Sequence, residues 1–127
     1  MQAKEKIWGQ DLLVFSGNCV EIHLLKLRPC PITGAPTSCS LHTHSVKNNL
    51  FWVLKGEVGI VMNGTYTLLL ENEMTEIFAG QEHMFIAAVP ATVIEIVWAN
   101  NITEDIHRKN EGRVLSMDEY YNLIGAA

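Results

Sequence analysis

The sequence predicts an all-β protein, because short segments rich in Val, Ile and Leu alternate with Gly, Pro and Asn over most of its length. Many short strands at such intervals are typical of β-sandwiches and closed barrels. A helical pattern is found at the C-terminus alone. With 127 residues, of which 48% are hydrophobic, the chain can bury one core, so we expect a single domain spanning residues 1–127.

The expected strands are bounded by turn-forming residues. Their aliphatic composition places them at residues 11–16, 19–28, 39–44, 50–54, 57–62, 65–70, 75–78, 83–88 and 92–98. The proline-rich segment 29–36 predicts an irregular loop between the second and third strands. Asn63-Gly64 predicts a tight hairpin, because both positions of a two-residue turn accept positive φ.

The last expected element is a short helix over about residues 116–124. Ser116 and Glu119 have the spacing of a capping box, in which each side chain binds the backbone N–H of the other residue. Gly125 follows the apolar positions and favours a helix end. The barrel itself is expected between about residues 7 and 114.

Charge and composition argue against several classes of partner. The net charge is −5 and the isoelectric point is near 5.4, and no basic cluster exceeds Arg108-Lys109, which argues against nucleic acid. No apolar run approaches the ~20 residues that span a bilayer, and the charged N-terminus does not resemble a signal peptide, so we expect no membrane partner. Cys19, Cys30 and Cys39 form no pairing motif, so we expect reduced thiols and a cytoplasmic protein.

Three histidines form the strongest functional pattern. His42 and His44 are separated by one residue on an expected strand, so both side chains project from the same face. If His83 arrives from a neighbouring strand, three imidazoles can hold a divalent transition metal and leave coordination positions open. The alternative is that these histidines only form hydrogen bonds inside the barrel. His23 is expected to be a hydrogen-bonded strand residue, and His107 a solvent-exposed one.

The spacing around these histidines resembles that of the cupin family. His42-x-His44, Asn49 and Gly56 have the form of the first cupin motif, and Gly80-x-x-His83 resembles the core of the second. The resemblance implies a double-stranded β-helix, or jelly-roll, barrel in which four side chains converge on one metal. Asn49 occupies the position at which the family normally has a glutamate ligand.

A further resemblance, to the C-terminal cupin domain of type II mannose-6-phosphate isomerase/mannose-1-phosphate guanylyltransferase, extends beyond the metal motifs. It is carried by Trp8-Gly9 and by residues 70–80, 102–106 and 112–113. It implies a metal-dependent isomerase or epimerase whose small-molecule substrate is a sugar phosphate, with Arg113 on the phosphate and Glu95 transferring the proton. Cupins also often pair through an outer sheet, so we expect a homodimer.

Both candidate catalytic residues have a structural alternative. Glu95 interrupts the apolar segment 93–97 and lies either in a polar cavity or on an exposed face. Arg113 either clamps a phosphate through two hydrogen bonds or is a surface residue before the last helix. Cys39 is expected to point away from the histidines, because its strand parity is opposite to theirs. The aromatic residues interpreted as barrel packing are Trp8, Phe51, Trp52, Phe78, Phe85 and Trp98.

Asn49 leaves the metal and the reaction open. With a neutral amide in place of a carboxylate, a bound ion keeps its full charge, so affinity should fall and imidazole-preferring ions should gain. The candidate cofactors are Zn, Fe, Mn, Ni and Co. The isomerase hypothesis therefore competes with a three-histidine iron dioxygenase, for which a neutral site is an advantage, and with a non-enzymatic sugar-binding cupin.

Overall fold

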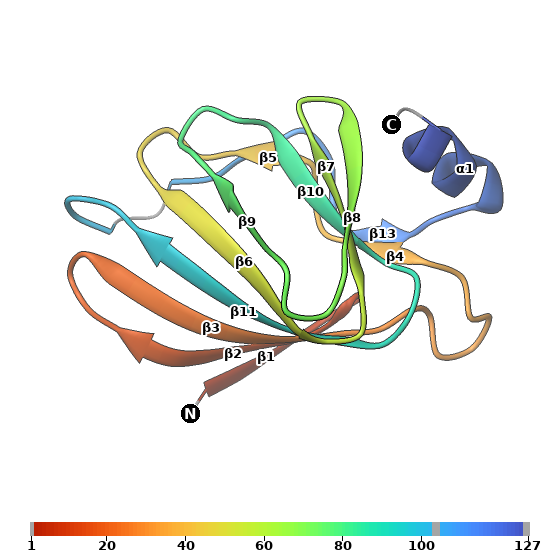
Figure 1. The fold of residues 1–127 in the computed structure, drawn as a ribbon, viewed down its shortest axis with the longest axis horizontal. Coiled ribbons are helices and arrows are strands. Elements are labelled where there is room, and N and C mark those ends of the chain that lie inside the picture. The colour runs from red at the N-terminus through yellow and green to blue at the C-terminus, as the bar shows by residue number, and fades with distance from the viewer. Residues whose placement is uncertain (1, 103–104, 126–127) are drawn as a thin grey trace.

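The computed structural model describes residues 2–102 and 105–125, which form a barrel of antiparallel strands with one helix outside it (Figure 1). This architecture confirms the predicted all-β fold with a short C-terminal helix. The elements in chain order are β1 (Gln2–Lys6), β2 (Gly9–Ser16), β3 (Val20–Leu27), β4 (Thr37–Ser38), β5 (His42–Thr43), β6 (Asn48–Lys55), β7 (Val58–Met62), β8 (Thr65–Leu69), β9 (Met74–Ile77), β10 (His83–Ala87), β11 (Ala91–Trp98), β12 (His107–Arg108), β13 (Arg113–Val114) and α1 (Met117–Gly125).

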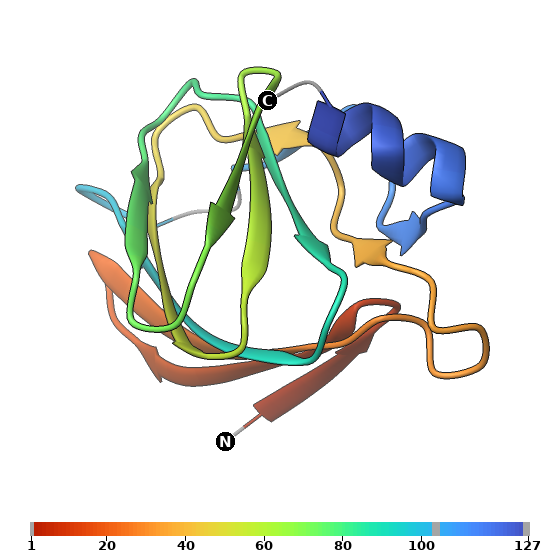
Figure 2. The same ribbon diagram turned by 45° about the vertical axis from the view of Figure 1, so that its right-hand side comes forward.

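Two sheets form the wall of the barrel. Six strands in the order β1-β2-β3-β11-β6-β9 make one sheet, and β12-β5-β10-β4-β13 make the second, which β7 and β8 extend. Figure 2 shows the six-stranded sheet curving around two sides of the barrel, with α1 outside it beside β4 and β13. Strands that are distant in sequence become neighbours in this topology, as β3 and β11 do along eight paired residues.

Side chains that point inward from both sheets fill the barrel. Burial alternates along β6, with Phe51 and Val53 inside, as expected for a strand with one face on the core. Trp8 packs edge-on against Phe85, with 4.9 Å between the ring centroids, so these aromatic residues are barrel packing as predicted. Each fully buried aliphatic or aromatic side chain contributes roughly 1.5–3 kcal/mol by leaving water. This packing fixes β6 and β10, which carry two of the candidate metal ligands.

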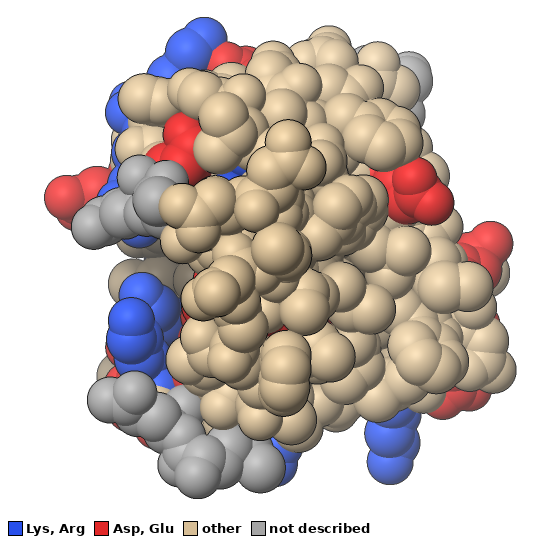
Figure 3. Space-filling view, turned by 90° about the vertical axis from the view of Figure 1, so that its left-hand side faces the viewer, with Lys and Arg blue, Asp and Glu red and all other residues tan. Residues whose placement is uncertain are grey.

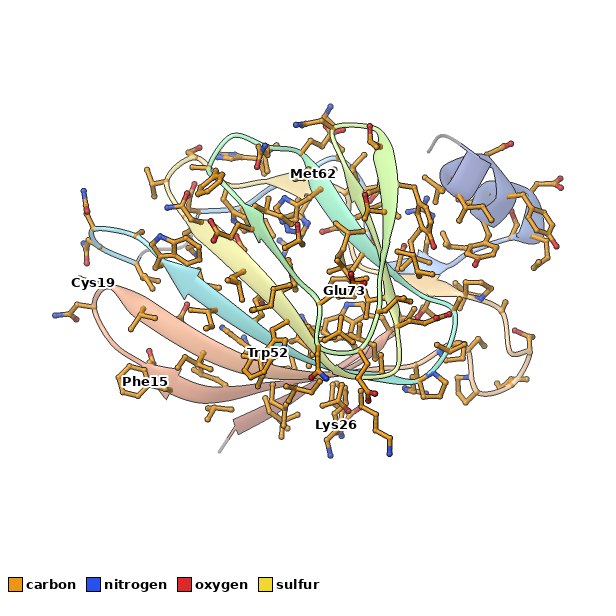
Figure 4. The ribbon with its side chains drawn as sticks, viewed as in Figure 1. Phe15, Cys19, Lys26, Trp52, Met62 and Glu73 are labelled. Atoms are coloured by element: carbon orange, nitrogen blue, oxygen red, sulfur yellow. The ribbon has the colours of Figure 1, made fainter. Side chains whose placement is uncertain are left out.

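The outer face of the six-stranded sheet is also apolar. Trp52 is 37% exposed and Phe78, just after β9, is 51% exposed, so the prediction that both pack inside the barrel is wrong. Strand alternation gives the reason for Trp52: Phe51 and Val53 take the inner positions of β6, which sends the residue between them outward. Phe15 likewise projects away from the barrel (Figure 4).

The predicted hairpin and helix cap are both confirmed. Asn63 and Gly64 join β7 to β8 with φ values of 49° and 82°. The Glu119 N–H donates to Ser116 Oγ at 3.1 Å, and the Ser116 N–H donates to Glu119 Oε1 at 3.3 Å. Strand β1 has no counterpart among the predicted strands, because its sequence is mostly charged; it forms by pairing with β2 along its whole length.

Helix α1 closes the chain against the outside of the second sheet. It lies beside β8, and its Tyr120 and Leu123 pack against buried core residues. The helix has nine residues. Within residues 2–102 and 105–125, no helix has the length and apolar character needed to cross a lipid bilayer.

Candidate metal centre and its cavity

The three histidines predicted as metal ligands lie together. His42 belongs to β5, His44 follows it directly, and His83 opens β10, where it pairs with His42 in the antiparallel register. Their candidate ligand atoms are all within 4.8 Å of one another. The Gly80 N–H donates to the carbonyl of His44 at 2.7 Å, and the φ of 87° at Gly80 favours glycine. This hydrogen bond joins the two motif segments, and the positive φ explains the glycine three residues before His83.

Hydrogen bonds to backbone carbonyls set the tautomer of each imidazole. The Nδ1 acceptors are Ser40 O at 2.7 Å for His42, Gln81 O at 3.0 Å for His83, and Asp105 O for His44. Because a carbonyl oxygen can only accept, each Nδ1 carries the hydrogen and each Nε2 keeps its lone pair. This second layer of contacts is the usual way in which proteins orient metal-binding histidines.

Burial keeps these imidazoles neutral. Desolvation, and after it the neighbouring imidazole of His83, lowers the pKa of His42 to about 3. Burial also lowers the pKa of His44 and of His83. A neutral imidazole with a free Nε2 is the form that coordinates a metal, so the cluster needs to lose no proton before binding one at neutral pH.

Asn49, the fourth candidate ligand, lies on β6 and lines the same cavity as His42 and His44. It is 2% exposed, and its Nδ2 donates to Glu95 Oε2 at 2.7 Å. A carboxylate only accepts hydrogen bonds, so the amide nitrogen faces Glu95 and Oδ1 faces away from it. Asn49 Oδ1 and His83 Nε2 are both buried without a hydrogen-bond partner in the described structure. Each such atom costs ~1–3 kcal/mol, and a bound metal ion would satisfy both, so these residues fit a divalent transition ion.

Of the two placements predicted for Glu95, a polar cavity or an exposed face, the structure shows the cavity. It projects from the inner face of β11 into a cavity of about 710 Å³ that His42, His44 and Asn49 also line. Burial raises the pKa of Glu95, while nearby His23 and the hydrogen bond from Asn49 lower it less strongly. A carboxyl group with a raised pKa beside a metal site can exchange protons with a ligand.

Comparison with known proteins supports the architecture. Neither a protein-family model nor a curated protein matches the sequence. Among solved structures, KdgF from Halomonas sp. matches with a TM-score of 0.68 at 16% identity, over 80% of this chain and 88% of that one. An uncharacterized conserved protein with a double-stranded β-helix domain from Klebsiella pneumoniae gives 0.64 at 18% identity, over 78% and 82%. A cupin superfamily protein from Desulfitobacterium hafniense gives 0.61 at 16%, over 71% and 76%.

The chain has the cupin fold. Identities this low carry the fold and nothing finer, so the resemblance to mannose-6-phosphate isomerase stays a prediction. Within the cupin barrel the three predicted histidine ligands converge, as the motif spacing implies, and Asn49, which departs from the motif, is hydrogen-bonded to Glu95.

Arg113 lies elsewhere in the cupin barrel. It belongs to β13 and does not line the cavity; its Nε and Nη2 bind Glu119 Oε2 at 3.0 and 2.9 Å. Glu119, which takes part in the capping box of helix α1, therefore binds the Arg113 guanidinium. This contact corrects the expectation that Arg113 reaches a phosphate in the site. The cationic side chains that line the cavity are Lys4, Lys6, Lys47 and Arg108.

His23 and Asp11 are site residues that sequence reasoning missed. His23 is hydrogen-bonded to Asp11 at 2.7 Å, as expected for a satisfied strand residue, but both side chains also line the cavity. Strand parity carries the missing signal, because Glu21, His23 and the buried Leu25 alternate on one face of β3. His107 is 65% exposed, as expected.

Cys39 lines the cavity, contrary to the parity argument. Strand parity does not apply here, because β4 ends at Ser38 and β5 begins at His42, so residues 39–41 do not continue one strand. The Cys39 Sγ accepts the N–H of Phe85 at 3.2 Å, and burial raises the pKa of the thiol to about 12. A thiol that stays protonated is a poor metal ligand.

Asp105 fixes the segment that follows His44, a role with no sequence signal. Its carboxylate accepts the backbone N–H groups of Ser45, Val46 and Lys47 at 2.9, 2.6 and 3.1 Å. Desolvation raises the pKa of Asp105, but these donors outweigh it and lower the pKa to about 2. Because its backbone carbonyl also accepts from His44 Nδ1, this one residue orients a ligand and the adjoining loop.

Proposed function

We propose that this protein binds one divalent transition metal through His42, His44, His83 and Asn49, and uses it as a sugar-phosphate isomerase or epimerase. The observation that carries the metal site is the pair of buried donor atoms without partners, Asn49 Oδ1 and His83 Nε2, in a cluster of neutral imidazoles. A metal ion supplies a partner to both atoms. Without a partner, each of these two buried atoms costs folding free energy.

A bound divalent ion would polarise a carbonyl or hydroxyl oxygen of the substrate. The protein's own groups provide the rest of the chemistry. Glu95 lies in the same cavity, and its raised pKa suits a group that removes a proton from one carbon and returns it to the next. Lys47 and Arg108 line the cavity and carry the positive charge that a phosphate requires, so we assign phosphate binding to them in place of Arg113.

A second candidate function, a three-histidine iron dioxygenase, is favoured by the neutral donor set. Three imidazoles and one amide leave the full charge on an Fe(II) ion, whereas a carboxylate ligand would offset one unit of it. The two candidates differ in their requirement for O₂. An isomerase turns over without oxygen, and a dioxygenase consumes it.

Elemental analysis tests the metal site first. We expect close to one equivalent of a divalent ion in the parent protein and little in His83→Ala. His107→Ala, which removes an exposed histidine outside the cluster, should keep the parent content. A parent protein that stays metal-free after incubation with Zn, Fe, Mn, Ni and Co would contradict both enzyme proposals and leave the sugar-binding cupin.

Activity assays then separate the two reactions. The metal-loaded protein is tested anaerobically for interconversion of mannose 6-phosphate and fructose 6-phosphate, and the Fe(II) form is tested for O₂ consumption. Interconversion that His83→Ala loses and His107→Ala keeps supports the isomerase. Oxygen consumption without interconversion supports the dioxygenase.

We also propose that the protein is a cytoplasmic homodimer that associates through the outer face of the six-stranded sheet. Trp52, Met74 and Phe15 are exposed on this sheet, and Trp52 pairs directly with Met74 across β6 and β9. The side of the molecule seen in Figure 3 is uncharged across its centre, with charged residues towards its periphery. A second copy would cover such a surface. The three free cysteines agree with a reducing compartment.

A further inference from the structure

A second cluster of titratable side chains lies in the cavity, on strands that carry none of the candidate metal ligands. His23 on β3 and Asp11 on β2 both line the cavity. In the antiparallel register His23 is directly opposite Glu95 of β11, and Asp11 is opposite the buried Leu25. These side chains therefore share the inner face of the sheet and border the same ligand space as the metal centre.

The pair of Asp11 and His23 has a defined hydrogen-bond polarity. Asp11 Oδ1 and His23 Nδ1 are 2.7 Å apart. Because an ionised carboxylate only accepts, Nδ1 carries the hydrogen, and Nε2 is the ring nitrogen that can gain or lose a proton. A carboxylate that holds an imidazole in one tautomer is the arrangement of acid–base histidines.

The charged groups around His23 favour its protonated form. Burial lowers the pKa of His23, but the hydrogen bond to Asp11 and the negative charges of Glu95, Asp11 and Glu21 outweigh burial, so the pKa is raised. The neighbouring strand β1 adds Lys4, Glu5 and Lys6 to the cavity lining. His23 thus differs from the histidines of the metal centre, whose pKa values burial lowers.

We propose that Asp11 and His23 form a proton-exchanging pair that acts on the oxygen atoms of a hydroxy-carbonyl substrate in this cavity. The inference rests on the proposed isomerase function. Moving hydrogen between neighbouring carbons also requires that the carbonyl oxygen gains a proton and the adjacent hydroxyl loses one. Protonated His23 gives its Nε2 proton to the carbonyl oxygen as the carbon-bound proton leaves, and takes a proton from the neighbouring hydroxyl in the second half. The ring ends as it began, so the step needs no further proton donor and no oxidant.

An NMR titration of the Zn(II)-loaded protein tests the pair without turnover. We expect the His23 ring to titrate with a pKa above the ordinary histidine value of 6.5 and with Nδ1 protonated throughout, and its signals to shift when mannose 6-phosphate is added. In Asp11→Asn the pKa of His23 should fall, because the hydrogen bond to the Asp11 carboxylate is the largest of the interactions that raise this pKa against burial. Glu21→Gln is the matched control and should change this pKa less. A His23 whose pKa does not lie above 6.5, or that ignores the sugar phosphate, overturns the proposal.

Turnover gives the second test. In His23→Asn we expect kcat to fall by roughly 100-fold or more, with KM and metal content close to those of the parent. His107→Asn should keep the parent kcat. A His23→Asn variant with full metal content and a kcat within about threefold of the parent contradicts the role. If the parent loads metal but turns over no sugar phosphate, the isomerase proposal fails separately, and the response of His23 to mannose 6-phosphate decides the pair by itself.

Discussion

The two faces of the six-stranded sheet differ in the polar and apolar side chains that they carry. Towards the cavity the inner face carries Asn49, Glu95, His23 and Asp11, whereas the outer face exposes apolar residues such as Trp52. An antiparallel sheet with one solvated face ordinarily buries its apolar side and exposes its polar side. Here polar side chains join apolar ones such as Phe51 and Val53 on the inner face, and the outer face exposes apolar ones, which is the basis for proposing a ligand inside and a second copy outside.

The inner face tolerates its polar groups because they are paired across strands. Asn49 of β6 donates to Glu95 of β11, and Asp11 of β2 binds His23 of β3. Asn49 lines the cavity, and its Oδ1 is buried without a hydrogen-bond partner in the described structure. On the outer face, Trp52 and Met74 make only an apolar cross-strand pair. We therefore propose chemistry at the inner face and association at the outer one.

The largest expected effect is the loss of metal affinity when the unpaired amide oxygen of Asn49 is removed from the inner face. Asn49→Leu keeps the side-chain size but supplies no donor atom, so we expect metal affinity to fall by about 100-fold in a chelator competition assay. Leu54→Ala, on the outward side of the same strand, should leave the affinity unchanged. Equal affinities for the parent and Asn49→Leu would show that the amide is not a ligand.

The next effect concerns the outer face alone. Trp52→Glu places a charge in the proposed interface, and we expect the dimer dissociation constant to rise by about 30-fold, as for a central interface residue. Analytical ultracentrifugation measures it. Tyr121→Glu makes the same kind of change on helix α1, away from the sheet, and should leave the dimer intact. A monomeric parent would refute the association, and a loss of metal in Trp52→Glu would show that the two faces are not independent.

The sequence predicts the three-histidine cluster well, because the spacing of the histidines can be interpreted from strand alternation and one strand pairing. His42 and His44 share a face by strand parity, and His83 needs only one antiparallel pairing to reach them. Asn49 can be anticipated as a donor from the motif, but its orientation cannot, since Glu95 is 46 residues away and reaches it only through the pairing of β6 with β11.

Other features depend on information that the sequence pattern lacks. Residues 50–54 are all apolar, so periodicity cannot tell that Phe51 points inward and Trp52 outward. Arg113 was placed in the site by resemblance alone, whereas the capping box of α1 supplies Glu119 as its partner. Asp11 meets His23 across the β2–β3 pair, whose register shifts between Leu13 and Phe15.

A smaller effect on metal affinity is expected at Glu95, where two variants distinguish the negative charge of the side chain from its role as a hydrogen-bond acceptor. Glu95→Leu removes the acceptor that turns the Asn49 amide, and we expect metal affinity to fall by about tenfold. Glu95→Gln still offers an oxygen to Asn49 Nδ2, so its affinity should stay within about threefold of the parent. Isothermal titration calorimetry with Zn(II) measures both. A loss in Glu95→Gln as large as that in Glu95→Leu would mean that the negative charge, which both variants remove, and not the hydrogen bond supports the metal.

The smallest expected effect is the acid sensitivity of the metal-free barrel. The folded pKa of His42 is about 3, against an ordinary value of 6.5, so between these values the unfolded chain binds a proton that the folded chain does not. The stability contributed by neutral His42 is therefore full above pH 6.5 and is lost as the pH falls towards 3. His44 and His83 are shifted in the same direction. We expect the Tm of EDTA-treated protein to fall between about pH 7 and 5, and to fall less in His42→Gln. Trp52→Leu, a change confined to the outer face, should keep the parent slope, and a slope that changes in this variant instead would place the acid sensitivity outside the barrel.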